Sequence, residues 1–146
     1  MGKRTAAGAL LLCTWVLVNC SDDPTGNPDE FDIGVVELRV GTQVARVSVD
    51  GEVEGRITLP IGDTIGSVVF LDRAGEGLNF QDDSERNVVV SSGDEAIVSW
   101  NRLNKETGFI VARMEGSTFL SITLSHDDHN EFGPRAIPIE VAGQLP

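Results

Sequence analysis

Tyrosine is absent from this chain of 146 residues, and aromatic residues make up only 5% of it. Surfaces that stack sugars or peptides present several rings, so the composition predicts no such platform. Cysteine is nearly absent too, since only Cys13 and Cys20 occur, both near the N-terminus. The rest of the chain therefore forms no disulfide, and its hydrophobic core must hold it together unaided.

Basic residues are also few. The 11 lysines and arginines face 23 aspartates and glutamates, which gives a formal net charge of −12 at pH 7. Nucleic-acid binding rests on cations that neutralise phosphates, so this balance argues against a nucleic-acid partner. The acidic excess favours solubility and leaves cation binding open.

The common catalytic motifs are missing. The sequence has no Gly-x-Ser-x-Gly elbow, no His-Glu-x-x-His helix and no phosphate-binding glycine loop. Its glycine-rich phrases, at residues 50–55 and 75–77, have the composition of hairpin turns. We therefore expect a protein that is not an enzyme.

The N-terminus has the pattern of an export signal. Lys3 and Arg4 precede a short apolar run over residues 6–18, which is typical of a secretory signal. A comfortable membrane span needs about 20 apolar residues, and this run is shorter. We therefore predict a signal peptide over residues 1–19.

Residues 17–20, Leu-Val-Asn-Cys, resemble the lipobox of bacterial lipoproteins. The resemblance implies that Cys20 carries a lipid and that the protein is anchored in the bacterial cell envelope, facing the periplasm or the exterior. Asn19 departs from the pattern, because glycine, alanine or serine usually stands before the cysteine. An uncleaved signal anchor, or cleavage elsewhere with Cys20 as an ordinary thiol, is the alternative.

Residues 20–31 are polar, with two prolines and several acids. This composition is typical of a flexible tether between the anchor and a folded domain over residues 32–146. A calcium-binding loop is the alternative interpretation of the acids, but the ligand spacing of an EF-hand is absent.

The remaining sequence predicts strands. Residues 33–40 alternate between apolar and polar side chains, as a half-buried strand does. Pro60 removes a backbone donor, so it indicates an edge strand or the end of a strand, and the apolar run 66–71 predicts the middle of a sheet. Further strands are predicted over residues 45–49, 56–61, 88–90, 96–100, 108–112, 116–118, 120–124 and 137–141. We expect an all-β fold without helices.

The order of features over residues 87–124 is a strand, a Ser-Ser-Gly-Asp corner, a second strand, and two strands that begin with glycine. This order resembles the bacterial group 2 immunoglobulin-like domain. The Leu-Asp-x-x-Gly turn at residues 71–75 extends the likeness. The resemblance implies an immunoglobulin-like β-sandwich of about seven strands. It also implies a non-enzymatic binding or structural module at the membrane surface, with a protein partner there.

Four aromatic residues are expected between the two sheets because they are the largest side chains of the predicted strands. They are Phe70, Trp100, Phe109 and Phe119.

Both histidines of the chain fall within residues 125–135, a segment that we predict to be a hairpin loop at one pole of the sandwich. The candidate metal ligands in it are His126, His129, Asp127, Asp128 and Glu131. Imidazole with carboxylate suits Zn²⁺, Ni²⁺ or Cu²⁺, whereas carboxylates alone suit Ca²⁺. A divalent-metal-binding lipoprotein is therefore the second functional hypothesis. The alternative is a solvated polar loop whose histidines bind nothing.

Overall fold

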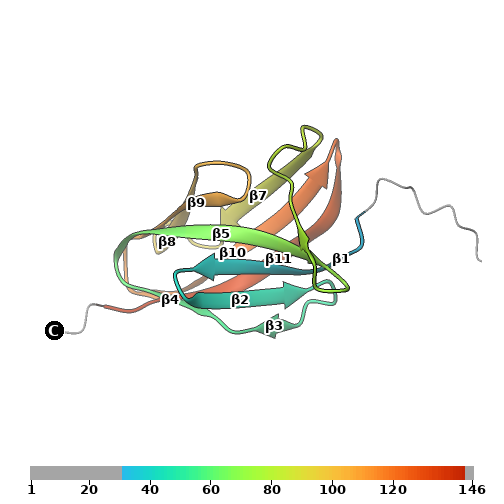
Figure 1. The fold of residues 1–146 in the computed structure, drawn as a ribbon. Coiled ribbons are helices and arrows are strands. Elements are labelled where there is room, and N and C mark those ends of the chain that lie inside the picture. The colour runs from blue at the N-terminus through green and yellow to red at the C-terminus, as the bar shows by residue number, and fades with distance from the viewer. Residues whose placement is uncertain (1–30, 144–146) are drawn as a thin grey trace, which may run out of the picture.

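The structure is a computed structural model that describes residues 31–143 (Figure 1). These residues form eleven strands and no helix, so none of them lies in a helix that could cross a membrane. The strands are β1 (Ile33–Val40), β2 (Gln43–Ser48), β3 (Val53–Glu54), β4 (Ile57–Leu59), β5 (Gly62–Asp72), β6 (Gly77–Leu78), β7 (Arg86–Ser92), β8 (Val98–Arg102), β9 (Thr107–Ala112), β10 (Gly116–His126) and β11 (His129–Val141).

The strands pair into two sheets that Figure 1 shows stacked as two layers. The first sheet, sheet A, has the order β3-β2-β1-β5-β9-β8, with β6 against β5. The second, sheet B, has the order β4-β11-β10-β7. In sheet A, β1-β5-β9-β8 follow the A-B-E-D order of immunoglobulin domains, and in sheet B, β7-β10-β11 follow the C-F-G order. The predicted immunoglobulin-like sandwich is confirmed.

Four strands exceed the seven that we predicted. The β2–β3 hairpin is inserted between β1 and β4, and the three-residue β4 pairs in parallel with β11. The two-residue β6 covers the end of β5. The predicted strands over residues 45–49 and 56–61 correspond to β2 and β4, whereas β3 and β6 were not predicted, because two residues are too few to show an alternating pattern.

Two positional predictions are confirmed. The strand before Pro60, β4, lies at an edge of sheet B, where a residue without a backbone N–H costs no ladder bond. The apolar strand β5 lies between β1 and β9 in sheet A, covered by the core on its inner face.

The aromatic core differs from the prediction. Phe70 is fully buried as expected, and it makes edge-to-face ring contacts with Phe80 and Phe132, at centroid distances of 5.5 and 5.9 Å. The prediction for Phe119 is wrong, because this ring is 43% exposed. Leu120 occupies the inward position beside it, so period-two alternation turns Phe119 outward.

Phe109 is another ring that does not lie between the sheets. It pairs with Ile65 on the outer face of sheet A and is half-buried there. Trp100 lies on the inner face as predicted, where it covers Gly108 from the edge strand β8. A Cβ at Gly108 would lie 2.5 Å from the Trp100 ring, so this close packing needs glycine.

Strand β8 begins later than we predicted. The backbone N–H groups of Ile97 and Val98 both donate to the carbonyl of Asp94, at 3.2 and 3.0 Å. The Asp94 carboxylate also accepts the N–H of Ala96 at 2.9 Å. These local bonds make residues 94–97 a turn, because aspartate satisfies nearby backbone donors that a strand would otherwise use.

Candidate functional site

The segment predicted as a hairpin loop, which holds both histidines, forms the tip of the β10–β11 hairpin. Strand β10 runs to His126, β11 begins at His129, and the two histidines are directly opposite each other in the register. Asp127 and Asp128 alone form the turn, and Asp127 has a φ of 51°. Aspartate tolerates this left-handed conformation better than most residues. The predicted hairpin is therefore present, but its loop is limited to Asp127 and Asp128 and does not extend over residues 125–135.

A β-bulge orients the next acid of the hairpin. The register pairs Ser125 with Asn130 and Leu124 with Phe132, so Glu131 is an extra residue in β11. Bulges redirect side chains that the regular pleat would place elsewhere. Here Asn130 is exposed, whereas the side chain of Glu131 is only 4% exposed.

Arg86 neutralises this buried acid. Its side chain, at the start of β7, is 6% exposed, and its Nε and Nη2 donate to the two carboxylate oxygens of Glu131, each at 2.8 Å. Its Nη1 donates to the carboxylate of Asp83 at 3.0 Å. The guanidinium also lies over the ring of Phe31, 4.6 Å from the centroid. Paired bonds of this kind fix both orientation and charge.

The pKa directions agree with this geometry. The hydrogen bonds to Glu131, followed by those to Asp83, raise the pKa of Arg86 above its usual range against the opposing effect of burial. Partial desolvation acts to raise the pKa of Asp83, but the bonds from the Arg86 side chain and from the backbone of Glu85 and Arg86 together lower it. Arg86 and Asp83 therefore both stay charged at neutral pH.

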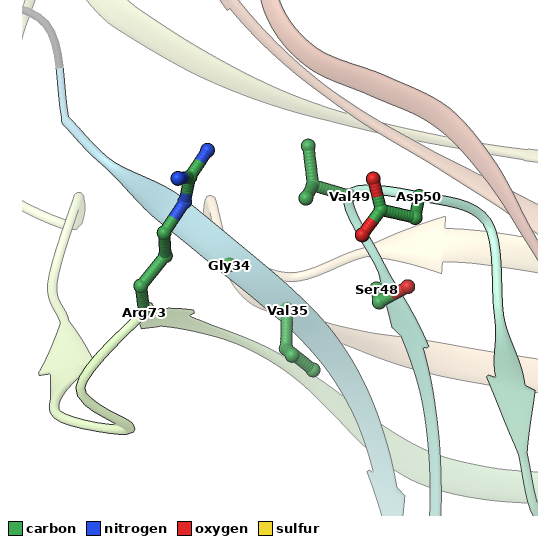
Figure 2. A pocket seen from close by; sticks show the side chains of 6 residues that line it. All are labelled: Gly34, Val35, Ser48, Val49, Asp50 and Arg73. Carbon is green, nitrogen blue, oxygen red and sulfur yellow. The ribbon is translucent and has the colours of Figure 1, made fainter.

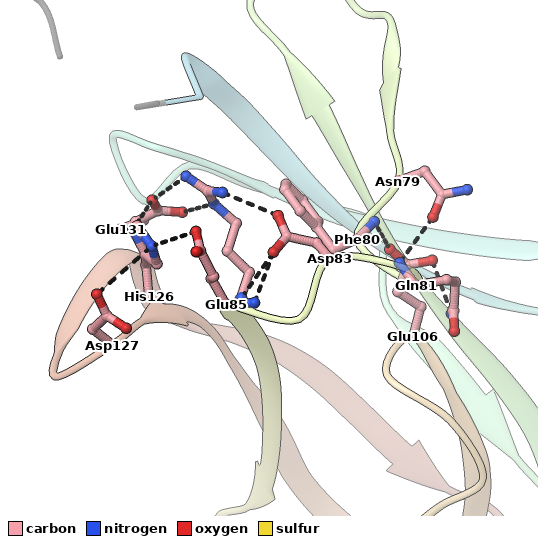
Figure 3. Close-up of polar contacts among 10 residues, drawn as sticks. Asn79, Phe80, Gln81, Asp83, Glu85, Glu106, His126, Asp127 and Glu131 are labelled. Atoms are coloured by element: carbon pink, nitrogen blue, oxygen red, sulfur yellow. Dashed lines mark hydrogen bonds and ion pairs between the residues drawn. The ribbon is translucent and has the colours of Figure 1, made fainter. Parts of the chain in front are cut away.

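His126 lies among acids, as Figure 3 shows. Its Nδ1 is 3.3 Å from a carboxylate oxygen of Glu131. On the other side of the ring, Nε2 is 3.4 Å from a carboxylate oxygen of Glu85 and 3.8 Å from one of Asp127. Each nitrogen of this partly buried imidazole thus faces at least one carboxylate.

His129 completes the group. Its exposed ring lies 5.6 Å from that of His126, centroid to centroid. Ligand atoms of His126, His129 and Glu131 all lie within 4.8 Å of one another. Asp127 borders this group, and Asp128 is exposed at the turn, outside it. We call His126, His129 and Glu131 the histidine cluster. Cys20 lies outside the described residues, so its lipidation stays a prediction.

The sequence interpretation missed Asp83, Glu85 and Arg86, which lie between the predicted strands over residues 66–71 and 88–90. One signal was present, since Arg86 shares the core-facing parity of Val88. A buried cation requires a buried acid, but sequence spacing does not reveal which of the 23 acids supplies it.

The outer face of sheet A is a second region of interest. Ile65 is 57% exposed and lies opposite Phe109 across the β5–β9 pair. Across the β1–β5 pair, Val35 lies opposite Leu71, and Val69 lies between Leu71 and Ile65 along β5. We call this face the outer patch, and its apolar members are Val35, Ile65, Val69, Leu71, Phe109 and Val111.

Glu37 is the acid embedded in this face, where it pairs with Val69 in the register. Its side chain is only 3% exposed because two arginines cover it. Arg39 donates to one carboxylate oxygen at 2.6 and 2.8 Å, and Nη2 of Arg46 lies 2.8 Å from the other. These three side chains carry a net charge of +1, in a chain whose net charge is −12.

A cleft of about 460 Å³ lies where β1 begins and β2 ends (Figure 2). Its walls carry Arg73 on one side and Asp50 and Ser48 on the other, with the backbone of Gly34 between them. Arg73 also donates to Asp32 at 2.9 Å, and both side chains are exposed. Among the described residues, the cleft is lined by one carboxylate, that of Asp50, and by no histidine.

Comparisons with known proteins give no family. No protein-family model matches the chain, and no curated protein matches it. Domains 5 and 6 of the S-layer protein SbsC are similar in structure, with a TM-score of 0.43 and 19% identity over 62% of this chain and 41% of that one. Domains 4 and 5 of the same protein give a TM-score of 0.42 and 16% identity over 75% and 53%.

The chain thus spans about half or less of the S-layer fragments that it matches. At such low TM-scores these neighbours carry no argument about function, and the proposals below rest on the geometry of this chain.

Proposed function

We propose that the protein is a non-enzymatic lipoprotein of the bacterial cell envelope whose immunoglobulin-like domain binds a protein partner through the outer patch. The single observation that carries this proposal is an apolar sheet face on a strongly acidic chain. Ile65 and Phe109 form its centre, and Arg39 and Arg46 offset the charge of Glu37 within it.

Physical reasoning supports a docking role for this face. Contiguous apolar surface is rare on proteins that do not associate, and it marks interaction sites when polar groups surround it. Interface centres lack uncompensated charge, and arginine is among the residues enriched in them. The expected partner therefore offers an apolar contact surface with acidic groups that meet Arg39 and Arg46.

The location rests on the N-terminal sequence. The apolar run 6–18 and the Leu-Val-Asn-Cys motif support export and a lipid on Cys20. One acyl group alone binds membranes reversibly, so stable anchoring needs the several chains that a bacterial lipoprotein carries.

The docking proposal is tested by photo-crosslinking in cells that express the full chain. A photoreactive amino acid replaces Ile65 in one variant and Ala136 in the control variant. Ala136 is exposed on the outer face of sheet B, opposite Ser121. We expect a discrete crosslinked protein from position 65 and none from position 136. Equal crosslinking from both positions would contradict the proposal. A crosslinked dimer of the chain would contradict a separate protein partner and show that the outer patch binds a second copy of this chain.

The anchoring proposal is tested by fractionating cells that express the native chain or Cys20→Ala. We expect the native chain in the membrane fraction with a lipid-sized mass on its N-terminal peptide. The variant should be released into the soluble fraction or retained as unprocessed precursor. A native chain without added mass on Cys20 would contradict lipidation and leave the docking proposal standing.

A second candidate function is divalent-metal binding at the hairpin tip. It is favoured by the convergence of ligand atoms from His126, His129 and Glu131 to within 4.8 Å of one another. The two candidates use different regions of the domain, so they are tested independently.

A further inference from the structure

We propose that the histidine cluster binds one divalent metal ion, namely Zn²⁺, Cu²⁺ or Ni²⁺. In this proposal Glu85 is the fourth ligand and Arg86 is a positioning residue. The inference rests on the second candidate function and specifies its ligands and its metal class.

The donor set selects the metal. Two imidazoles with carboxylates suit Zn²⁺, Cu²⁺ or Ni²⁺, whereas Ca²⁺ and Mg²⁺ prefer sites made of oxygen alone. The Nδ1 of His126 and the nearest oxygen of Glu131 are 3.3 Å apart. Two ligands of a tetrahedral ion with bonds of about 2.0–2.1 Å lie about 3.4 Å apart, so this pair is already spaced for coordination.

The other two ligands, one from the hairpin and one from the segment before β7, need only side-chain rearrangement. His129 is the cross-strand partner of His126, and its exposed ring can turn toward the ion without disturbing the core. Glu85 is exposed as well, and its carboxylate already lies 3.4 Å from the Nε2 of His126. Glu85 faces Nε2 whereas Glu131 faces Nδ1, so the Glu85 side chain rotates to reach an ion on the Nδ1 side of the ring.

The bond to Arg86 does not remove Glu131 from the ligand set. Each oxygen of Glu131 accepts one N–H from Arg86, at 2.8 Å, and a carboxylate has about four lone-pair sites. Carboxylates that bind metals are commonly held by a hydrogen bond of this kind from a neighbouring group. Arg86 therefore holds the Glu131 carboxylate in one orientation next to the imidazoles.

The local charge favours a dication despite the guanidinium. Five carboxylates lie in or beside the hairpin tip, and with Arg86 they give a net charge of −5 + 1 = −4 when both imidazoles are neutral. They are Asp83, Glu85, Asp127, Asp128 and Glu131. In the competing interpretation, His126 keeps its contacts with Glu131 and Glu85 and binds no metal.

The test is calorimetric titration of the full chain with Zn²⁺ and, separately, with Ca²⁺. Cys13 and Cys20 are replaced by serine in every sample, so that no thiol competes for metal. His126→Ala/His129→Ala removes both imidazoles. Glu95→Gln/Glu115→Gln is the control that lowers the acidic charge at exposed positions outside the hairpin. Circular dichroism checks that each variant is folded.

We expect one Zn²⁺ per chain in the parent and in the control, no saturable binding in the histidine variant, and no matching Ca²⁺ site. Glu85→Gln should weaken binding about tenfold at unchanged stoichiometry. If the histidine variant still binds one Zn²⁺ per chain, the protein binds metal, but the ligand set proposed here is wrong. Weak binding at many sites, equal in all variants, would contradict both the proposed ligand set and the metal-binding function.

Discussion

The domain contains two carboxylates that are almost completely buried, and they are neutralised in different ways. Glu131 is 4% exposed and its partner Arg86 is 6% exposed, so both charges of that pair are shielded from water. Glu37 is 3% exposed, but Arg39 and Arg46, which cover it, are each 47% exposed. Glu131 and Arg86 lie at the tip of the β10–β11 hairpin, which we call the hairpin pole. Glu37 and its two arginines lie in the outer face of sheet A, beside the outer patch.

This difference determines how much each region can rearrange. If Glu131 moves away, Arg86 stays in a low-dielectric environment without its bidentate partner, which is costly. If Arg39 or Arg46 moves away from Glu37, the guanidinium enters water at little cost. The pole is therefore a rigid carboxylate site, suited to hold an ion, and the outer patch is an adaptable surface, suited to a protein.

The largest expected effect is at Glu131. Glu131→Ala removes the bidentate partner of the buried Arg86, so we expect the free energy of unfolding to fall by about 3–5 kcal/mol, measured by urea denaturation.

Replacing both partners is the matched control. Because Arg86→Met/Glu131→Met leaves no buried charge, it should recover most of the stability that Glu131→Ala loses. A loss below about 1 kcal/mol for Glu131→Ala is typical of exposed ion pairs. It would show that Glu131 and Arg86 contribute no more to stability than Glu37 and its exposed arginines.

A smaller effect is expected at Phe31, whose ring supports the Arg86 guanidinium and packs edge-on against Phe80 at 5.1 Å. Phe31→Ala should lower the free energy of unfolding by about 1–2 kcal/mol, because it removes a ring pair and a cation–π contact. Phe31→Leu, which keeps apolar area but no ring, is the control. If the two variants lose equal stability, the ring itself contributes nothing at this pole.

Glu37→Gln should cost less than the change at Glu131. We expect about 1 kcal/mol in urea denaturation, because both arginines turn into water when the carboxylate charge is lost. A loss as large as that of Glu131→Ala would show that the exposed guanidinium groups are held as tightly as Arg86. The variant also serves as a folded control for metal titrations, since no histidine lies beside Glu37 in the register.

The smallest effect is a pH dependence at Asp83, whose folded-state pKa is lowered from 3.8. The folded state binds this proton more weakly than the unfolded state does. The carboxylate therefore adds stability above pH 3.8, and that stability is lost as pH falls through the lowered pKa. Urea denaturation of the native chain and Asp83→Asn should differ at neutral pH and converge in acid. A difference that does not shrink as the pH falls below 3.8 would contradict this origin.

The sequence predicts the fold better than the site because strands are local patterns. Residues 33–40 alternate, and β1 has those same bounds. Local alternation also places Phe119 outward and Arg86 inward, so both could have been assigned by parity. The core ring of Phe80 lies in a segment without regular alternation, and only tertiary packing reveals it.

The histidine cluster was predictable only in part. His126, His129 and Glu131 are close in the sequence and meet in space, whereas Asp127 and Asp128 form the turn between them. The inward orientation of Glu131 depends on a bulge, and its partner Arg86 is 45 residues away. Neither a bulge nor such a long-range pair leaves a recognisable local pattern.

The most direct test of the central claim, that the rigid pole is a metal centre, is anomalous diffraction at the zinc edge. Crystals of the protein would be grown with one equivalent of Zn²⁺. We predict a single strong anomalous peak within about 2.0–2.2 Å of donor atoms of His126, His129 and Glu131. Peaks confined to other acidic side chains, with the Glu131–Arg86 pair and both imidazoles free of metal, would contradict the account.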